Sequence, residues 1–441
     1  MNIRISVVAI TVIAALLLSG CGENYKWDTD NSSKLEGKYE TRDRSLDLTQ
    51  NQQVEIAKSM TQRLLYANKD LAGITMSIRY GDASTVNFAY GCAKLKPEVE
   101  ASGILNYEAG HASNCEVPLT TEHRLKLGSL TKTAVGRTIL DIDDDSSYDF
   151  SIEDQITKHL PADILALGDL SGITVRDLLY HTSGLSNQFD FVTGGTAKEI
   201  IKRVLEIKRA GKPGQFYQYN NSGYVILGQI IQHVTKAQSW EGEVQKRMNT
   251  SLGYNSFIFP EAANPNWIET KDTSWMSGKE GTLLSGENSL ATGYAFSEHF
   301  IPVIGVSGAD IANSAGSMIG TVPDVNKWMH NLGTNDGGLL SSEYFKNIIT
   351  DGTFRDDYLS HLTWNMGPGL GYEQNQNTYF HLGSFTGYTC VSIYSKNEKT
   401  TLSVCTNGMT GLFIDFPYEV LNAMYPYRAA YLPQSSTTSS H

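Results

Sequence analysis

The chain is 441 residues long, with 40% hydrophobic and 19% charged residues and a formal net charge of −12. This balance is typical of a well-packed globular protein and excludes a mostly disordered chain. An acidic chain without a long basic run is a poor nucleic-acid binder, so no nucleic-acid partner is expected. The length allows about three domains of roughly 150 residues or one large α/β unit.

The first residues resemble an export signal. Arg4 precedes an apolar stretch, residues 5–18, which is too short to cross a bilayer comfortably and is typical of a signal peptide. The stretch ends in Leu-Ser-Gly-Cys at residues 18–21, which resembles a bacterial lipobox in which Cys21 is lipidated and becomes the mature N-terminus. An ordinary secretory signal is the alternative. With Gly22 next, the resemblance implies a periplasmic, lipid-anchored protein, sorted to the outer membrane.

Composition divides the chain into a leader, a tether, a folded domain and a tail. After the signal peptide at residues 1–20, residues 21–48 are polar and are expected to form a flexible tether. Residues 49–428 carry the apolar patterns of a single folded domain. Residues 429–441 end in a Ser/Thr-rich run and are expected to be disordered.

Within the folded domain, strands are expected near both ends and helices between them. In chain order, the expected elements are a helix at 49–69, strands at 74–80 and 86–90, a loop at 93–122, mainly helices to about 330, strands at about 368–408 and a closing helix at 417–424. This order indicates an α/β (α+β) fold, with one antiparallel sheet built from both chain ends and an inserted helical subdomain.

The cysteines agree with export to an oxidising compartment. Besides the lipidation site four cysteines remain, which allows three pairings. Cys390 and Cys405 lie in two strand-like segments, and a hairpin centred between them places the two residues directly opposite each other, within disulfide reach. Cys92 and Cys115 are left to pair. Four free buried thiols are the alternative, which such a compartment disfavours.

Ser129 and Lys132 form the first candidate catalytic pair. They follow Gly128 where a loop is expected to enter a helix, and the i, i+3 spacing puts the hydroxyl and the amine on one helical face. Backbone N–H groups at the helix start add a positive dipole end. A hydroxyl needs a base to become a nucleophile, and a partly desolvated lysine can act as that base. By itself the pair is also compatible with a helix cap and an exposed lysine.

The second motif is Tyr219-x-Asn221, which precedes an apolar, helix-like run. The phenol of Tyr219 can relay a proton, and the amide of Asn221 can hold a carbonyl group and a lysine. A polar turn ahead of an apolar helix would give the same pattern, so this motif indicates a catalytic site only together with the other motifs.

The third motif contains His381, Leu382, Gly383 and Ser384, at the end of a strand-like segment. The strand would present His381, and Gly383 allows another backbone to approach closely. An edge-strand histidine beside a bulge is the structural alternative.

In this order and at these separations, the motifs resemble those of the serine β-lactamase and penicillin-binding-protein superfamily, which are Ser-x-x-Lys, Tyr-x-Asn and Lys/His-Thr-Gly. The resemblance is closer to class C β-lactamases, D-alanyl-D-alanine carboxypeptidases, and related esterases and D-aminopeptidases. Segments at residues 173–185, 314–318 and 369–372 are also similar to the family, and the resemblance spans roughly residues 70–410. It implies the β-lactamase/transpeptidase-like fold.

The resemblance also implies a role for each reactive residue. Ser129 would attack an acyl carbonyl and form an acyl-enzyme, while Lys132 and Tyr219 share the base role, with neither assigned as the main base. Asn221 would position the lysine and the substrate carbonyl. The backbone N–H groups of Ser129 and Ser384 would form the oxyanion hole.

Two departures from the family pattern bear on the substrate. His381 stands where class C β-lactamases usually have lysine, and a mostly neutral histidine binds a carboxylate less firmly. Leu382 stands in place of a threonine whose hydroxyl contacts the substrate carboxylate in the family. Together with Gly383 and Ser384, His381 is expected to bind the substrate. The departures favour an ester, a D-amino-acid amide or a peptide over a β-lactam.

The expected function is therefore that of a serine hydrolase, similar to carboxypeptidases, aminopeptidases or esterases, acting on a small-molecule or peptide substrate. A true β-lactamase and a catalytically silent scaffold on the same fold are the alternatives. His181 is interpreted as structural, because in this superfamily lysine takes the base role. The sequence has no zinc-ligand spacing, so neither a metal nor a cofactor is expected.

Overall fold

The computed structural model describes residues 47–430 with internal gaps. The gaps are residues 69–70, 82–83, 97–106, 109–110, 113–114, 187–194, 249–252, 255, 260–289, 297–299, 303–311, 337–339, 346–353, 357–363, 374–375, 386 and 409–414. The predicted signal peptide and lipidation site at Cys21 lie outside the described residues. At the other end a 3-10 helix, η10 (Pro426–Ala430), spans residue 428, where the folded domain was predicted to end.

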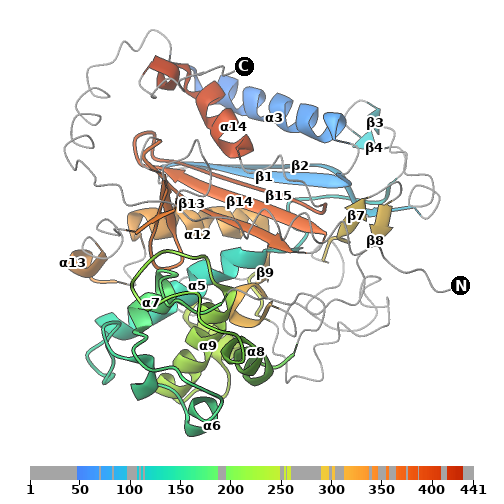
Figure 1. Cartoon of the computed structure of the whole chain (residues 1–441). Helices are drawn as coiled ribbons and strands as arrows, with labels where there is room; N and C mark the ends of the chain where they lie inside the picture. The colour runs from blue at the N-terminus through green and yellow to red at the C-terminus, as the bar shows by residue number, and fades with distance from the viewer. Residues whose placement is uncertain are drawn as a thin grey trace, which may run out of the picture.

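A nine-stranded antiparallel sheet forms the centre of the molecule, and both ends of the chain contribute to it (Figure 1). In spatial order its strands are β10 (Phe354–Asp356), β11 (Trp364–Met366), β12 (Gly371–Glu373), β13 (Thr378–Phe385), β14 (Tyr388–Ser395), β15 (Thr400–Thr406), β1 (Gly73–Tyr80), β2 (Ser84–Leu95) and β5 (Cys115–Pro118). The two ends of the chain meet where β1 pairs with β15. This architecture confirms the predicted fold class.

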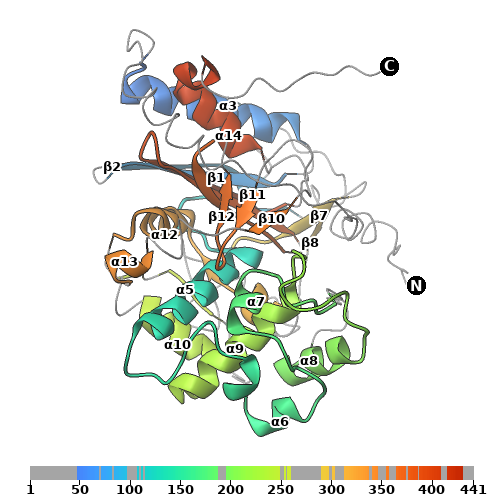
Figure 2. The ribbon, with the colours of Figure 1, turned by 60° about the vertical axis from the view of Figure 1, so that its left-hand side comes forward.

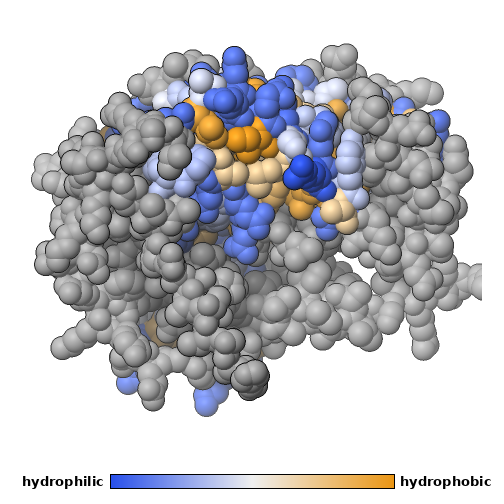
Figure 3. Space-filling model, turned by 90° about the horizontal axis from the view of Figure 1, so that it is seen from above, coloured by the Kyte–Doolittle hydropathy of each residue, from blue (hydrophilic) through white to orange (hydrophobic). Residues whose placement is uncertain are grey.

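Two helices cover the outer face of the sheet. The first, α3 (Gln50–Ala67), begins at Thr49, whose side chain forms a capping box with Gln52. Its apolar stripe packs on the sheet beside α14 (Phe416–Met424), and both helices were expected from the sequence. Figure 3 looks down on this layer, where hydrophilic side chains border a smaller apolar area. None of the helices in the described ranges has both the length and the apolar composition that spanning a membrane requires.

The inner face of the sheet packs against α12 (Val322–Thr334) and, beyond it, the inserted helical subdomain (Figure 2). The subdomain contains α5 (Thr131–Asp144), α6 (Ala162–Leu165), α7 (Val175–Leu179), α8 (Ala197–Leu205), α9 (Asn221–Thr235) and α10 (Trp240–Lys246). The apolar helix α9 packs against α5, α7, α8 and α10 and so forms the centre of this unit. Because helices cover both faces of the sheet, every residue of β14 is buried.

The remaining described elements are short. They are β3 (Tyr107–Glu108), β4 (His111–Ala112), β6 (Leu125–Lys126), β7 (Tyr294–Phe296), β8 (Phe300–Pro302), β9 (Ile319–Gly320), α13 (Ser342–Phe345) and the 3-10 helices η2 (Gly128–Leu130), η3 (Ile156–Lys158) and η7 (Asn313–Ala315).

The sequence patterns missed three strands at the two edges of the sheet. Residues 93–122 were expected to be a loop, but β2 extends to Leu95 and β5 pairs with it. The strands β10 and β11 precede residue 368, where strands were expected to resume. These edge strands have three or four residues each, so their formation depends on the neighbouring strand rather than on a local apolar pattern.

Both disulfides join strands, with the pairing that the sequence indicated. Cys390 lies directly opposite Cys405 in the β14–β15 ladder, with the Cα atoms 4.1 Å apart. Cys92 is bonded to Cys115, with the Cα atoms 5.4 Å apart, so this bond ties β2 to the edge strand β5.

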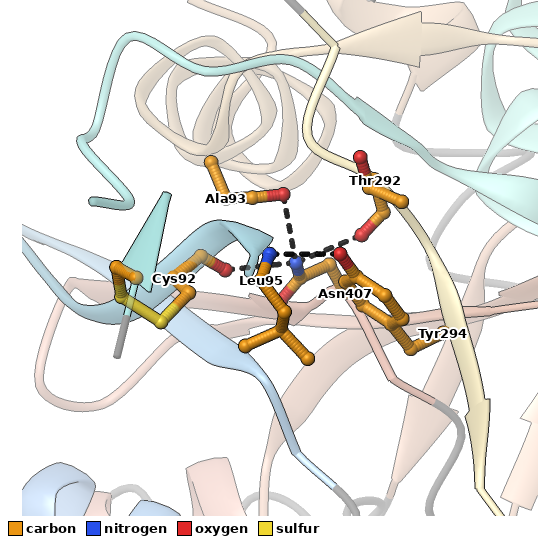
Figure 4. Close-up of a disulfide and its surroundings, with 7 residues drawn as sticks. Cys92, Ala93, Leu95, Thr292, Tyr294 and Asn407 are labelled. Atoms are coloured by element: carbon orange, nitrogen blue, oxygen red, sulfur yellow. Dashed lines mark hydrogen bonds between the residues drawn. A yellow bond between two sulfur atoms is a disulfide. The ribbon is translucent and has the colours of Figure 1, made fainter. Parts of the chain in front are cut away.

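Hydrogen bonds between the side chains of Asn407 and Tyr294 and the nearby main chain surround the Cys92 disulfide (Figure 4). The Asn407 side chain donates hydrogen bonds to the carbonyl groups of Cys92 and Thr292, both at 2.9 Å, and the Tyr294 hydroxyl accepts the N–H of Leu95 at 2.8 Å. These contacts bind the segment at residues 291–294 to the end of the sheet.

Candidate active site

Ser129 lies in η2, the turn that leads directly into α5. The preceding residue, Gly128, has a φ of +52°, and a Cβ atom there would lie 2.8 Å from the backbone nitrogen of Ser384. Glycine therefore allows this turn both its left-handed conformation and its close approach to β13. Ser129 therefore lies where the sequence predicted, at the point where a loop enters a helix.

Gly383 makes the same close approach from the side of β13. A Cβ atom at this position would overlap the carbonyl oxygen of Leu127 and lie 3.1 Å from the backbone nitrogen of Leu130. Since β12 ends its pairing with β13 at Phe380, the later part of β13 borders η2 instead of another strand on that side. Ser384 is exposed there, so its backbone lies beside the serine-bearing turn at the surface of the site.

Lys132 is fully buried in the first turn of α5. Its Nζ atom lies 3.1 Å from Ser129 Oγ, 2.8 Å from Asn221 Oδ1 and 2.6 Å from the carbonyl oxygen of Ala315. Burial lowers the pKa of this lysine well below its usual value. None of the carboxylates in the described part of the chain forms an ion pair with it.

Asn221 is the first residue of α9, and the residue before it caps the helix. Asn220 accepts the N–H of Gly223 at 2.8 Å through its side-chain oxygen and donates to the carbonyl group of Leu185 at 2.7 Å. Asparagine is a favoured N-cap residue, which explains how it takes the place of the serine that is usual in the family motif. The cap fixes the start of α9 and with it the position of Asn221.

Tyr219 contacts both members of the first pair. Its hydroxyl lies near the Ser129 side chain, and Lys132 Nζ lies 4.9 Å from the centre of its ring. Desolvation raises the pKa of this phenol, and the interaction with Ser129 opposes that shift. A second ring, that of Tyr224, lies 5.6 Å from the same amine. Tyr219 is therefore a neutral phenol placed beside the candidate nucleophile.

His381 is buried in β13, with 3% of its surface exposed. Its Nδ1 atom lies 2.7 Å from the carbonyl oxygen of Leu382, which can only accept, so Nδ1 carries the proton. Burial and the nearby Lys132 lower the pKa of His381 to about 3. Its Nε2 atom is buried and has no hydrogen-bond partner among the described residues, so the ring has a free acceptor.

The structure thus brings together all the reactive residues that the sequence motifs supplied. Sequence reasoning missed the carbonyl group of Ala315 and the ring of Tyr224, although residues 314–318 were noted as similar to the family. A main-chain acceptor leaves no signal in the side-chain sequence, and Tyr224 has the pattern of a core residue. Within the described ranges, no three His, Cys, Asp or Glu side chains come together as a metal site would require.

The sequence matches the family model named Beta-lactamase over residues 75–419, which is most of the chain. The chain belongs to the beta-lactamase family. Among curated proteins, protein flp of Staphylococcus aureus (strain COL) is 27% identical over 157 residues, which cover 34% of this chain and 28% of flp. Unguisins hydrolase ungD' of Aspergillus campestris is 23% identical over 279 residues, covering 59% of this chain and 48% of that protein. The chain thus spans only 28% and 48% of the length of these two relatives.

Solved structures of similar fold extend over most of the chain. D-amino acid amidase from Ochrobactrum anthropi SV3 has a TM-score of 0.63 at 19% identity, covering 85% of this chain and 99% of the amidase. The octameric penicillin-binding protein homologue from Pyrococcus abyssi has a TM-score of 0.63 at 20% identity, covering 86% and 79%. These likenesses establish the fold. The family match indicates a serine hydrolase of the beta-lactamase-related type.

Proposed function

We propose that the protein hydrolyses an acyl compound through an acyl-enzyme on Ser129, with Lys132 as the main base. The single observation that carries this proposal is the set of three contacts made by Lys132 Nζ. Two of its partners, Asn221 Oδ1 and the Ala315 carbonyl oxygen, can only accept hydrogen bonds, whereas the Ser129 hydroxyl can also donate. A neutral amine has two N–H groups for the two acceptors, which leaves its lone pair for the proton of Ser129.

The pKa directions favour lysine over tyrosine as the base. Desolvation lowers the pKa of Lys132, which favours the neutral form that can accept a proton. Desolvation raises the pKa of Tyr219, which disfavours the phenolate. Tyr219 is then better suited to passing a proton on than to taking the first one. The faces of Tyr219 and Tyr224 lie where they stabilise the ammonium ion once it has formed.

The proposed reaction has two halves. In the first, the proton of Ser129 moves to Lys132 Nζ, and the freed Oγ bonds to the acyl carbon. The proton then passes through Tyr219 to the leaving nitrogen or oxygen as its bond to the acyl carbon breaks. In the second half, water loses a proton to the same groups and attacks the ester, which releases the acid and returns the proton to Ser129.

The backbone N–H groups of Ser129 and Ser384 are proposed to bind the oxyanion. The supporting observation is the close approach of η2 and β13 at Gly128 and Gly383, where neither backbone has room for a Cβ atom. Such a pair of fixed donors stabilises the charge that develops on the carbonyl oxygen. Loss of one donor typically lowers the rate by about 10²- to 10³-fold.

For the substrate, we propose an amide or ester without a carboxylate near the scissile bond, such as a D-amino-acid amide. The buried ring of His381 is neutral because burial lowers its pKa, so it has no positive charge with which to bind a carboxylate. The adjacent residue, Leu382, has no hydroxyl to bind a carboxylate either. The fold likeness to D-amino acid amidase from Ochrobactrum anthropi supports the same choice.

The experiment measures the turnover of several substrates by a protein of residues 49–441 and by its Ser129→Ala variant. A short-chain p-nitrophenyl ester tests for a live nucleophile, and turnover that disappears in the variant is the expected result. D-phenylalanine amide is then compared with a D-phenylalanine dipeptide that ends in a free carboxylate, and the amide is expected to have the higher kcat/KM by about tenfold or more. Rapid hydrolysis of a chromogenic cephalosporin would instead favour a β-lactamase. No Ser129-dependent turnover of any of these would favour the silent scaffold.

We also propose that the chain is exported and anchored through a lipid on Cys21. The support is the sequence at residues 5–21, an apolar stretch followed by Leu-Ser-Gly-Cys. Metabolic labelling of the full chain with a radioactive fatty acid tests this directly. Label and membrane fractionation should both be lost in Cys21→Ala, and label that persists in this variant would overturn the proposal.

A further inference from the structure

His181 has a backbone conformation that is unusual for its residue type. It follows α7 with a φ of 59°, in the left-handed region, and only 1% of its surface is exposed. The next residue, Thr182, is bound to Asp177 twice, by its N–H to the Asp177 carbonyl at 2.8 Å and by its hydroxyl to the Asp177 carboxylate at 2.9 Å. A left-handed histidine costs about 1 kcal/mol or more and persists where surrounding contacts over-determine it.

His181 binds the main chain on both sides of Tyr219. Its carbonyl oxygen accepts the N–H of Gln218 at 2.8 Å, and its ring atom Nδ1 accepts the N–H of Asn220 at 3.0 Å. The ring itself lies 4.5 Å from the ring of Tyr219, with the two planes tilted by 31°. His181 thus contacts the face of the Tyr219 ring, the peptide group that joins Tyr219 to Asn220, and the N–H of Gln218 one residue earlier.

The hydrogen bond to the His181 ring also influences the position of Asn221. The N–H bound by the His181 ring belongs to Asn220, the N-cap of α9, and Asn221 follows it in the chain. A carbonyl and an imidazole acceptor fix the peptide planes that precede Gln218 and follow Tyr219, which limits how far the side chain of Tyr219 can turn away from Ser129. The position of Tyr219 and the start of α9 therefore both depend on the placement of a single histidine.

The ring chemistry of His181 suits a positioning role and not a base. Because Nδ1 accepts a hydrogen bond, the ring proton is on Nε2, which is buried and has no partner in the described part of the molecule. A buried N–H without a partner costs about 1–3 kcal/mol, which offsets what the Nδ1 contact contributes to stability. Burial lowers the pKa of this ring well below its usual value, so it stays neutral.

We propose that His181 is a positioning residue, whose ring acceptor and left-handed backbone hold Tyr219 against Ser129 and Asn221 against Lys132. The inference rests on the proposed function, since this placement matters for turnover only if these residues move the proton. Loss of the Nδ1 acceptor is expected to lower kcat by about 10- to 100-fold, as a misplacement of roughly 1 Å does in other enzymes. KM should change much less, because His181 is placed behind Tyr219 and not against the substrate.

Two substitutions separate positioning from packing. His181→Asn keeps an acceptor on the γ branch, and asparagine tolerates the left-handed backbone, so it should retain kcat within about fivefold. His181→Phe keeps a ring of similar size without the acceptor and should show the full loss of kcat at nearly unchanged KM. His123 supplies a matched control, because it is also buried and its Nδ1 also accepts a backbone N–H, that of Thr120 at 3.1 Å. His123→Phe should leave kcat within about twofold.

A second readout keeps the inference testable without any substrate. In protein labelled with ¹³C at the tyrosine rings, Tyr219 should give signals of a fixed ring in the wild type and in His181→Asn, and averaged signals in His181→Phe. Equal kcat in the asparagine and phenylalanine variants would overturn the proposal, as would an unchanged Tyr219 ring signal in His181→Phe. If turnover proves independent of Ser129, the proposed function fails, and the ring signals still decide whether His181 holds Tyr219.

Discussion

The active site has two walls, of which one keeps the residue types of the family motifs and the other departs from them. The helical wall, formed by η2, α5 and the start of α9, carries Ser129, Lys132, Tyr219 and Asn221, all of the residue types that the family motifs require. The sheet wall, formed by the part of β13 that runs past β12 and borders η2, carries the departures, with His381 where a lysine is usual. The wall that would move protons is tightly hydrogen-bonded and buried, whereas the wall that would meet the substrate is the end of β13 that runs past its pairing with β12. Chemistry and selectivity are therefore placed on separate structural elements.

The largest effect is expected from removing the base on the helical wall. Lys132→Met keeps a long apolar chain but has no amine, so kcat/KM for the ester should fall by about 10³-fold or more. Lys327→Met on α12 is the control, since Lys327 stacks on Tyr254 at 4.8 Å and belongs to neither wall. Steady-state kinetics on both variants check this. Similar losses in both would contradict the assignment of Lys132.

A smaller but still large effect is expected from separating the two walls. Gly383→Ala places a methyl group on the carbonyl oxygen of Leu127, so β13 must move away from η2 and the oxyanion donors are misaligned. The expected loss in kcat is about 10²-fold. Gly367→Ala is the matched control, because the nearest atom to its Cβ lies at 3.4 Å. Wild-type kcat in Gly383→Ala would refute the close approach.

The sheet wall should make folding stability depend on pH. The pKa of His381 is about 3 in the folded protein and 6.5 when unperturbed, so between these values the unfolded chain binds a proton that the folded one does not. Stability therefore rises with pH through this window and is lost as the pH falls from 6.5 towards 3. The contribution is up to about 1.4 kcal/mol per pH unit.

Urea unfolding from about pH 4 to pH 7 measures this dependence. His381→Gln, which cannot titrate, should show a smaller decrease in the free energy of unfolding at low pH than the wild type. Equal slopes in the two proteins would mean that His381 takes up its proton in the folded state.

The smallest effect is expected at the cap of α9. Asn220→Ser keeps an N-cap oxygen for Gly223 but loses the bond to Leu185, and should cost about 1 kcal/mol. Asn220→Ala loses both contacts and should cost about 2 kcal/mol. Thermal unfolding of the pair checks the order. A serine variant less stable than the alanine variant would show that the cap is not the main role of this residue.

Local patterns predicted a large part of the fold and of the site. The helices at α3 and α14 follow from apolar spacing, and the facing positions of Cys390 and Cys405 follow from the length of one hairpin. The edge strands β5, β10 and β11 could not be predicted in this way, because three- and four-residue strands have too few positions to show a period. In the site, the contact of Lys132 with the Ala315 carbonyl could not be predicted either, because every residue has a main-chain carbonyl group and the sequence does not mark the one that is used.

By itself, the sequence determined which reactive groups the protein has and in what order they occur along the chain. Hydroxyl, amine, phenol and imidazole are properties of residue types, and i, i+3 spacing is a local matter. Only the tertiary structure decided the protonation states of Lys132 and His381, and only it set His181 against Tyr219. Burial and contacts between distant segments set these properties, because a pKa and a hydrogen bond depend on what surrounds a group in space rather than on its neighbours in the chain.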